Sequence, residues 1–325
     1  MPLETARKKL LMPCAWVIIL LLLFALAPRL RAPETELMPI LHGGEEYLPL
    51  GDGFAALDSS GIAVYDKHGE LLFDEKLPLS PELSASDGEL LAVCAENSVR
   101  LYSPKGMEGL LPAEDGEILA LELLGGSLAV SRTGGYYPCT VTFYARTTPL
   151  FRRCLSSGVC RELLLTEKGA CLMLEDELVF LSGPDEAARI TLPGVKALLA
   201  ADKGVCAQTG DALYFFKMDG SNTGTFEDRA GIVRSFSGEI CAQTEDGILL
   251  LNTDGSVRAV YDGERPLRFG TGLRPTVICG EKTLIFDENL EITQTIENKY
   301  IPVNVITDKN AAVVLWPLAA EIHRK

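Results

Sequence analysis

Pairs of apolar residues separated by one position recur along the chain at nearly regular intervals. The first members of successive pairs are 37, 42, 37, 35, 35 and 36 residues apart. Side chains two positions apart in an extended strand point to the same face, so each pair predicts a short strand with a buried face. The pairs are Ile62/Val64, Val99/Leu101, Val141/Phe143, Leu178/Phe180, Leu213/Phe215, Ile248/Leu250 and Leu284/Phe286. A β-type repeat of this period predicts a ring of similar sheets.

Each of these strands stands in the same local context. Around Ile248/Leu250, an opening strand is expected at 232–236, a more apolar strand at 240–242, and a turn with a more polar strand at 254–261. Asp254-Gly255 is a dipeptide that favours a tight hairpin turn. The segment 204–213 has a near copy at 238–248. Four antiparallel strands per repeat make one blade, so the sequence predicts an all-β propeller.

The two ends of the chain are expected to close the ring. The segments 302–316 and 318–324 supply three strands of a last blade, after which the chain ends. A propeller with an incomplete blade leaves open sheet edges, and the usual solution is that one terminus completes the blade begun by the other. Residues 37–41 are the candidate for the missing outer strand. This gives eight blades, or seven if the first or last unit is not a blade.

The N-terminal segment is typical of a membrane anchor. Residues 10–27 form an uncharged apolar run of 18 residues, with Arg7, Lys8 and Lys9 before it. This length is at the threshold for a membrane span, and the basic cluster favours a cytoplasmic N-terminus. We therefore expect a cytoplasmic tail at 1–9, an uncleaved signal anchor at 10–28, a linker at 29–46 and an extracytoplasmic propeller at 47–325. Cleavage after Ala27 is the alternative, disfavoured by Pro28.

The charge of the chain limits its partners. The formal net charge is −15 at pH 7. Such acidity repels phosphate backbones, so nucleic-acid binding is not expected. It favours a soluble exported domain, which we expect to be monomeric.

The cysteines fall into two groups. Five lie on the second strand of their blades and are expected to be small buried hydrophobes: Cys94, Cys171, Cys206, Cys241 and Cys279. Cys139, Cys154 and Cys160 instead cluster in blade three and at the start of blade four. If the hairpin turn lies at 147–148, residue 141 faces 154, and a Cys139–Cys154 disulfide needs only a small register shift. No Cys-x-x-Cys motif or nearby histidine suggests zinc, and we expect neither metal nor cofactor.

The third blade departs from the spacing of the others. Its extra residues lie at 131–138, in a loop expected on the face where propellers commonly bind ligands. Arg132, Tyr136 and Tyr137 are the candidate ligand-binding residues, because tyrosines beside flexible glycines make adaptable contact surfaces. Three more arginines, at 146, 152 and 153, give this blade a basic character. The alternative is an elongated hairpin without a partner.

The sequence contains no convergent catalytic set. The three histidines stand at 42, 68 and 323, none near a nucleophile, and there is no Gly-x-Ser-x-Gly elbow. Asp219 and Asp254 lack the ligand run of a calcium loop and are interpreted as turn residues. We therefore expect a non-enzymatic module that binds a protein or a cell-wall component. The alternative is an extracytoplasmic glycan hydrolase or lyase with carboxylates at the channel mouth.

The strand pattern over about 37–325 resembles the quinoprotein-like and WD40-like β-propellers. Together with one N-terminal anchor, it resembles the membrane-anchored propellers of Gram-positive bacteria that are grouped as a domain of unknown function. The Trp-Asp dipeptide of WD40 blades is absent, and Trp316 is the only tryptophan beyond the anchor. The adjacent cysteines of quinone dehydrogenases are also absent, and the glycine pairs at 43, 125 and 134 are too few for kelch repeats. The resemblance therefore implies the fold and no specific ligand.

Overall fold

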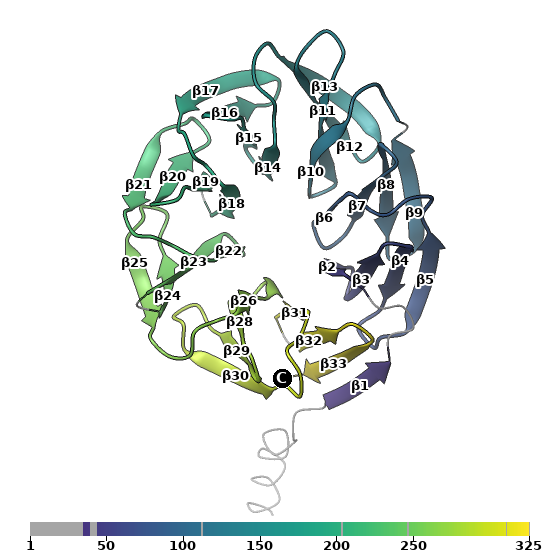
Figure 1. The fold of residues 1–325 in the computed structure, drawn as a ribbon, viewed down its shortest axis with the longest axis vertical. Helices are drawn as coiled ribbons and strands as arrows, with labels where there is room; N and C mark the ends of the chain where they lie inside the picture. The colour runs from purple at the N-terminus through teal and green to yellow at the C-terminus, as the bar shows by residue number, and fades with distance from the viewer. Residues whose placement is uncertain are drawn as a thin grey trace, which may run out of the picture.

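The part of the chain that the structure describes is a ring of eight β-sheets (Figure 1). The structure is a computed structural model and describes residues 35–39, 44–111, 113–202, 204–245, 247–309 and 311–324. Each sheet contains four antiparallel strands of a blade, and the last sheet has one further short strand. The prediction of an eight-bladed propeller is confirmed, and the seven-bladed alternative is excluded.

The strands of the first four blades follow one another in chain order. They are β2 (Glu46–Leu50), β3 (Gly53–Asp58), β4 (Gly61–Tyr65) and β5 (Leu71–Lys76); β6 (Leu83–Ser86), β7 (Leu91–Ala95), β8 (Ser98–Ser103) and β9 (Gly106–Leu111); β10 (Ile118–Leu124), β11 (Ser127–Thr133), β12 (Cys139–Ala145) and β13 (Thr148–Leu155); β14 (Glu162–Thr166), β15 (Gly169–Met173), β16 (Glu177–Ser182) and β17 (Asp185–Thr191).

The remaining blades continue in the same way and end at the C-terminus. Their strands are β18 (Ala197–Ala201), β19 (Gly204–Gln208), β20 (Leu213–Lys217) and β21 (Asn222–Phe226); β22 (Val233–Phe236), β23 (Glu239–Thr244), β24 (Gly247–Leu251) and β25 (Val257–Tyr261); β26 (Arg268–Phe269), β28 (Thr276–Cys279), β29 (Lys282–Phe286) and β30 (Ile292–Glu297); β31 (Asn304–Thr307), β32 (Ala311–Trp316), β33 (Ala319–Arg324) and β1 (Thr35–Pro39), with β27 (Thr271–Gly272) parallel to β31.

The strand order defines two faces of the ring. The first strand of each blade lies nearest the axis and the fourth lies outermost (Figure 1). Because neighbouring strands are antiparallel, the loops between second and third strands share one face with the connections between blades. We call this the connector face. The opposite face carries the turns between first and second strands and between third and fourth strands.

The last blade is closed by the N-terminal strand. β1 pairs antiparallel with β33, from Thr35 opposite His323 to Pro39 opposite Ala319. In Figure 1 the purple β1 lies beside the yellow β33. The expected closing strand therefore falls here, two residues earlier than 37–41. The proline stands at the end of an outermost strand, where no further neighbour needs its missing N–H.

The hydrophobic core is divided among the interfaces between blades. Each of the eight interfaces has its own cluster of buried residues drawn from the two adjoining blades. All of the apolar pairs that predicted the repeat lie on third strands and are buried. A side chain on either face of a blade thus packs against a neighbouring blade, which explains why the second strands are apolar at nearly every position.

The second-strand cysteines occupy these interface cores. Cys94, Cys171, Cys206 and Cys241 are fully buried, whereas Cys279 is partly exposed at the end of β28. Burial raises the pKa of the Cys206 thiol to about 12 and that of Cys94 to about 11. The thiols are therefore protonated at neutral pH, and the interpretation as buried hydrophobes is confirmed for these four.

The expected tail at 1–9, anchor at 10–28 and most of the linker at 29–46 lie outside the described residues. Among the described ones, no helix has the length and apolarity that crossing a membrane requires.

Candidate functional site

The loop between β11 and β12 is the candidate site from the sequence, and it projects from the connector face. We call residues 134–138 the aromatic loop. Gly134 and Gly135 have φ angles of +97° and +77°, a backbone conformation that glycine adopts without strain. Tyr136 is 93% exposed and Tyr137 is 38% exposed. Their rings meet edge to face with centroids 5.1 Å apart. The loop therefore presents a paired aromatic surface to its surroundings.

Arg132 does not belong to this surface. Its side chain is only 3% exposed and points toward blade two. One of its nitrogens, Nη1, donates to Asn97 Oδ1 at 3.0 Å and to Asn97 O at 3.3 Å. Asn97 Nδ2 in turn donates to the carbonyls of Gly116 at 2.6 Å and Glu114 at 2.9 Å. The structure thus corrects the expectation of an exposed contact residue. Arg132 instead bonds the foot of the aromatic loop, by which we mean the flanking residues 131–133 and 139, to blade two.

The other arginines of blade three are engaged in ion pairs with neighbouring blades. Arg146 pairs with Glu108 at 2.9 Å and Arg152 with Glu114 at 2.9 Å. Arg153 pairs with Glu186 at 2.7 Å. These pairs neutralise the basic character that the sequence suggested.

The register of blade three separates the two cysteines of the expected disulfide. Val141 faces Arg153, and Cys154 faces Thr140, so the predicted register is wrong by one residue. Neighbouring strand positions point to opposite faces of a sheet. Cys139 is accordingly buried against blade four, while Cys154 is exposed, and both are free thiols. This geometry does not favour a Cys139–Cys154 bond.

Two carboxylates that the sequence interpretation missed line a cavity beside the axis of the ring. The cavity has a volume of about 250 Å³ and is formed by the innermost strands of blades two to five. Burial, and secondarily the charge of Glu162, raises the pKa of Glu122 to about 7. Burial also raises the pKa of Glu162, although the carboxylate accepts a hydrogen bond from the backbone N of Leu198 at 3.1 Å. The signal in the sequence was a glutamate within the apolar segments 121–124 and 162–165.

The environment of these carboxylates differs from that of a glycosidase. Acid and base roles require two groups whose pKa values are moved apart, whereas burial moves both of these upward. The rest of the lining is mainly aliphatic, including Leu121, Leu163 and Leu198, with no aromatic side chain.

The face opposite the connector face contains two larger hollows. The first has a volume of about 480 Å³, lies between blades three and four, and is lined by Leu124, Leu150 and the stacked rings of Phe143 and Phe151. The second has a volume of about 690 Å³, lies at blades five to seven, and is mostly polar. Its charged lining residues are Asp202, Glu239, Arg258, Arg274, Asp287 and Glu288. In the second hollow, Arg258 is paired with Glu239.

The described residues include no group of three or more potential metal ligands. Asp219 and Asp254 each accept hydrogen bonds from the backbone N and the hydroxyl of a serine two residues later. These bonds lower the pKa of both carboxyl groups. The two aspartates stabilise hairpin turns, as the sequence indicated.

Comparison with known proteins supports the fold but assigns no family and no function. No protein-family model matches the sequence, and no curated protein matches it significantly. BamB from Moraxella catarrhalis superposes with a TM-score of 0.60 at 13% identity, covering 90% of this chain and 98% of that chain. The C-terminal WD40 domain of Sif2 gives 0.63 at 11% identity, covering 89% and 98%. BBS1N, solved in complex with ARL6DN, gives 0.56 at 9% identity, covering 90% and 95%. The described chain thus has a β-propeller fold similar to that of these structures.

Proposed function

We propose that this protein is a membrane-anchored propeller that binds a protein or a cell-wall component outside the cytoplasmic membrane, without catalysing a reaction. The observation that carries the binding role is the aromatic loop. An exposed tyrosine offers apolar area and a hydroxyl while losing little conformational freedom on binding. Tyr136, 93% exposed, is the most exposed of the large hydrophobic residues described.

The foot of the aromatic loop is held on both sides, which favours a preformed contact surface. On one side Arg132 is bonded to Asn97 of blade two. On the other, Ser131 Oγ donates to the carbonyl of Cys160 at 3.0 Å, at the entrance to blade four. These two bonds fix the residues before the loop, and Thr133 is paired with Cys139 across its base, so both ends are held and the loop loses less entropy when a partner binds.

The direction of β1 supports an outward-facing loop. β33 starts after the turn from Trp316 on the connector face and runs to the opposite face. Because Thr35 lies opposite His323 near the end of β33, the chain enters β1 from the face opposite the aromatic loop. An anchor at 10–28 would therefore hold that opposite face toward the membrane and direct the aromatic loop away from it. The same proposal includes that this chain is related to the membrane-anchored propellers of Gram-positive bacteria.

The complex of BBS1N with ARL6DN is an example of this architecture in a protein assembly. We extend that kind of role to this chain as part of the proposal.

Site-specific photo-crosslinking in the full-length protein tests the binding role. A photoreactive amino acid is placed at Tyr136 in cells, and at Tyr300 as the matched control. Tyr300 is 67% exposed and lies on the connection between blades seven and eight, so it shares the connector face. We expect a discrete adduct from position 136 that disappears when Tyr137 is also changed to alanine. Equal adduct patterns from both positions would show that the aromatic loop has no dedicated partner.

A glycan hydrolase or lyase is the second candidate function. The observation that favours it is the cavity that Glu122 and Glu162 share, although burial raises both pKa values instead of moving them apart. They are the described carboxylates with raised pKa values. If they catalyse hydrolysis, E122Q and E162Q will each abolish release of reducing ends from cell-wall glycans by the full-length protein. If wild-type and variant proteins release none, this candidate is excluded.

A further inference from the structure

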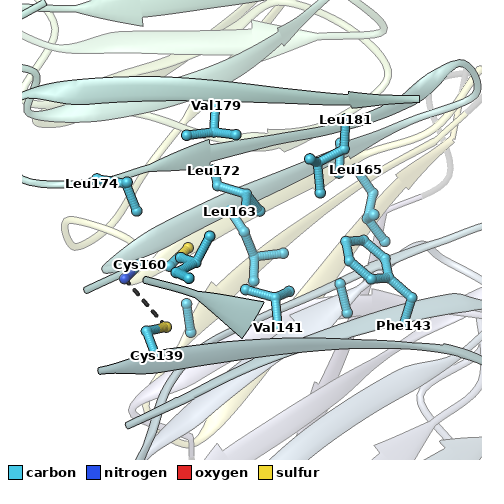
Figure 2. Close-up of a cluster of buried hydrophobic side chains, with 14 residues drawn as sticks. Cys139, Val141, Phe143, Cys160, Leu163, Leu165, Leu172, Leu174, Val179 and Leu181 are labelled. Atoms are coloured by element: carbon cyan, nitrogen blue, oxygen red, sulfur yellow. Dashed lines mark hydrogen bonds between the residues drawn. The ribbon is translucent and has the colours of Figure 1, made fainter. Parts of the chain in front are cut away.

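Two buried cysteines meet at the interface between blades three and four. Cys139 is the first residue of β12 and directly follows the aromatic loop. Cys160 lies in the connection from β13 to β14. Both side chains are 0% exposed and belong to one cluster, and Figure 2 shows them beside Val141 and Leu163.

The contacts between the two residues are close. The backbone N of Cys160 donates to Cys139 Sγ at 3.5 Å, drawn as the dashed line in Figure 2. Ser131 Oγ lies 3.2 Å from Cys139 Sγ and also donates to the carbonyl of Cys160. The sulfur of Cys139 therefore rests against the backbone of Cys160. Disulfides need Cα atoms roughly 4.4–6.8 Å apart, and direct contact of one sulfur with the other residue's backbone is compatible with that range.

A disulfide with Cys139 requires the side chain of Cys160 to change its rotamer. Cys160 Sγ points toward the carbonyl of Glu162, to which it donates at 3.2 Å. Because Cys139 Sγ already contacts the backbone N of Cys160, the turn needed is about the Cα–Cβ bond of Cys160, and the hydrogen bond given up is a weak one. Cys154 has no such route, because it lies on the opposite face of blade three.

We propose that Cys139 and Cys160 form a disulfide under oxidising conditions, which ties the foot of the aromatic loop to blade four. A thiolate of the pair attacks a sulfur of a disulfide oxidant, which forms a mixed disulfide and releases one thiol. The second thiolate then attacks the mixed disulfide at the protein sulfur, forms the Cys139–Cys160 bond and releases the second thiol. The two cysteines lose two protons and two electrons in total. The oxidant takes up both and leaves as two thiols.

The bond forms most readily before the interface is complete. Burial raises the pKa of the Cys160 thiol to about 12, so the folded protein contains little of the attacking thiolate. A disulfide acquired during folding is then shielded from reductants by the same burial.

Refolding of the full-length protein in detergent tests the proposal independently of any partner or location. The unfolded, reduced chain is refolded with glutathione disulfide, the remaining thiols are alkylated, and the protein is digested without reduction. We expect mass spectrometry to detect a peptide pair joined through Cys139 and Cys160. The cross-link should persist in C154S and disappear in C160A. Recovery of both cysteines as alkylated thiols, or a cross-link from Cys139 to Cys154, would overturn the proposal.

Thermal unfolding supplies a second measurement with a matched control. The oxidised wild-type protein should unfold at a higher temperature than the reduced protein, since the cross-link restricts the unfolded chain. C206A also removes a buried interface thiol, from the cluster between blades five and six, and should keep this difference. C160A should lose it. A difference that survives in C160A would place the responsible bond elsewhere and refute the assignment.

Discussion

At the scale of single residues, burial determines which polar groups have special properties. Glu122 and Arg132 are both charged residues within largely apolar strands. Arg132 has hydrogen-bond partners for Nη1, whereas its Nε is buried without one. Glu122 lines the cavity near the axis, where burial favours its neutral form. Each residue therefore has a measurable effect on stability.

Glu122 should make stability depend on pH. Its pKa rises from 4.5 to about 7 on folding, so between these values the folded state keeps a proton that the unfolded chain has released. Stability is then fully present below the unfolded pKa and falls as pH rises, by up to about 3 kcal/mol across this window. In E122Q we expect the free energy of unfolding, measured in urea, to fall less between pH 5 and pH 8. The exposed-residue variant E288Q should behave as wild type, and a wild-type slope in E122Q would contradict the assignment.

Arg132 should contribute to stability through Asn97. Because R132M removes the donor to two oxygens of Asn97, we expect the free energy of unfolding to fall by about 2 kcal/mol. A double-mutant cycle with N97A isolates the bond to Asn97 Oδ1, since N97A keeps the backbone carbonyl, and additive effects would show that the two side chains are not coupled. Y136A changes an exposed loop residue and should alter stability by less than about 0.5 kcal/mol.

At the scale of elements, the blades share one plan and two of them depart from it. Blade three carries the aromatic loop, and blade eight takes its outer strand from the other end of the chain. The aromatic loop changes the surface that the ring presents to its surroundings. The N-terminal strand β1 joins the two ends of the ring. The first departure concerns binding and the second concerns stability.

Removal of β1 should weaken the ring. A chain that starts at residue 44 leaves the edge of β33 unpaired along the five residues that β1 covers. Each lost hydrogen bond is worth roughly 0.5–1.5 kcal/mol, so we expect the free energy of unfolding, measured in urea, to fall by about 2–5 kcal/mol. An open edge also favours association, which light scattering measures. A chain starting at residue 33 keeps β1 and is the control; equal stability of the two chains would show that β1 contributes little.

At the scale of the whole molecule, the ring separates two faces with different chemistry. The connector face carries the aromatic loop, and the opposite face carries the apolar and polar hollows. β1 begins at the face with the hollows. Location outside the membrane would therefore expose the aromatic loop and the outermost strands to the surroundings.

Cys154 offers a direct test of that location, because it is an exposed thiol on the outermost strand of blade three. A membrane-impermeant maleimide applied to intact cells should label the full-length protein at Cys154. C154S should lose most of the labelling, since Cys279 is the only other described cysteine that is not fully buried. Labelling that occurs only after lysis would show that the propeller lies on the cytoplasmic side of the membrane.

The repeat period and the apolar alternation predicted four-stranded blades, eight in number with seven as the alternative, the closing strand within about two residues, and the burial of second-strand cysteines, which holds for four of the five. These properties depend on local pattern, which every blade repeats. The partners of individual side chains were not predictable. Arg132 was expected on the surface because it adjoins a loop, and only packing of blade three on blade two buries it against Asn97.

The sequence by itself therefore determined the architecture, because alternation and spacing are properties of a strand and its neighbours along the chain. The tertiary structure alone decided which cysteine meets Cys139, since a one-residue change of register moves every side chain to the other face of a sheet. It likewise decided that Glu122 and Glu162 share one cavity near the axis, because their strands come together only when the blades form a ring.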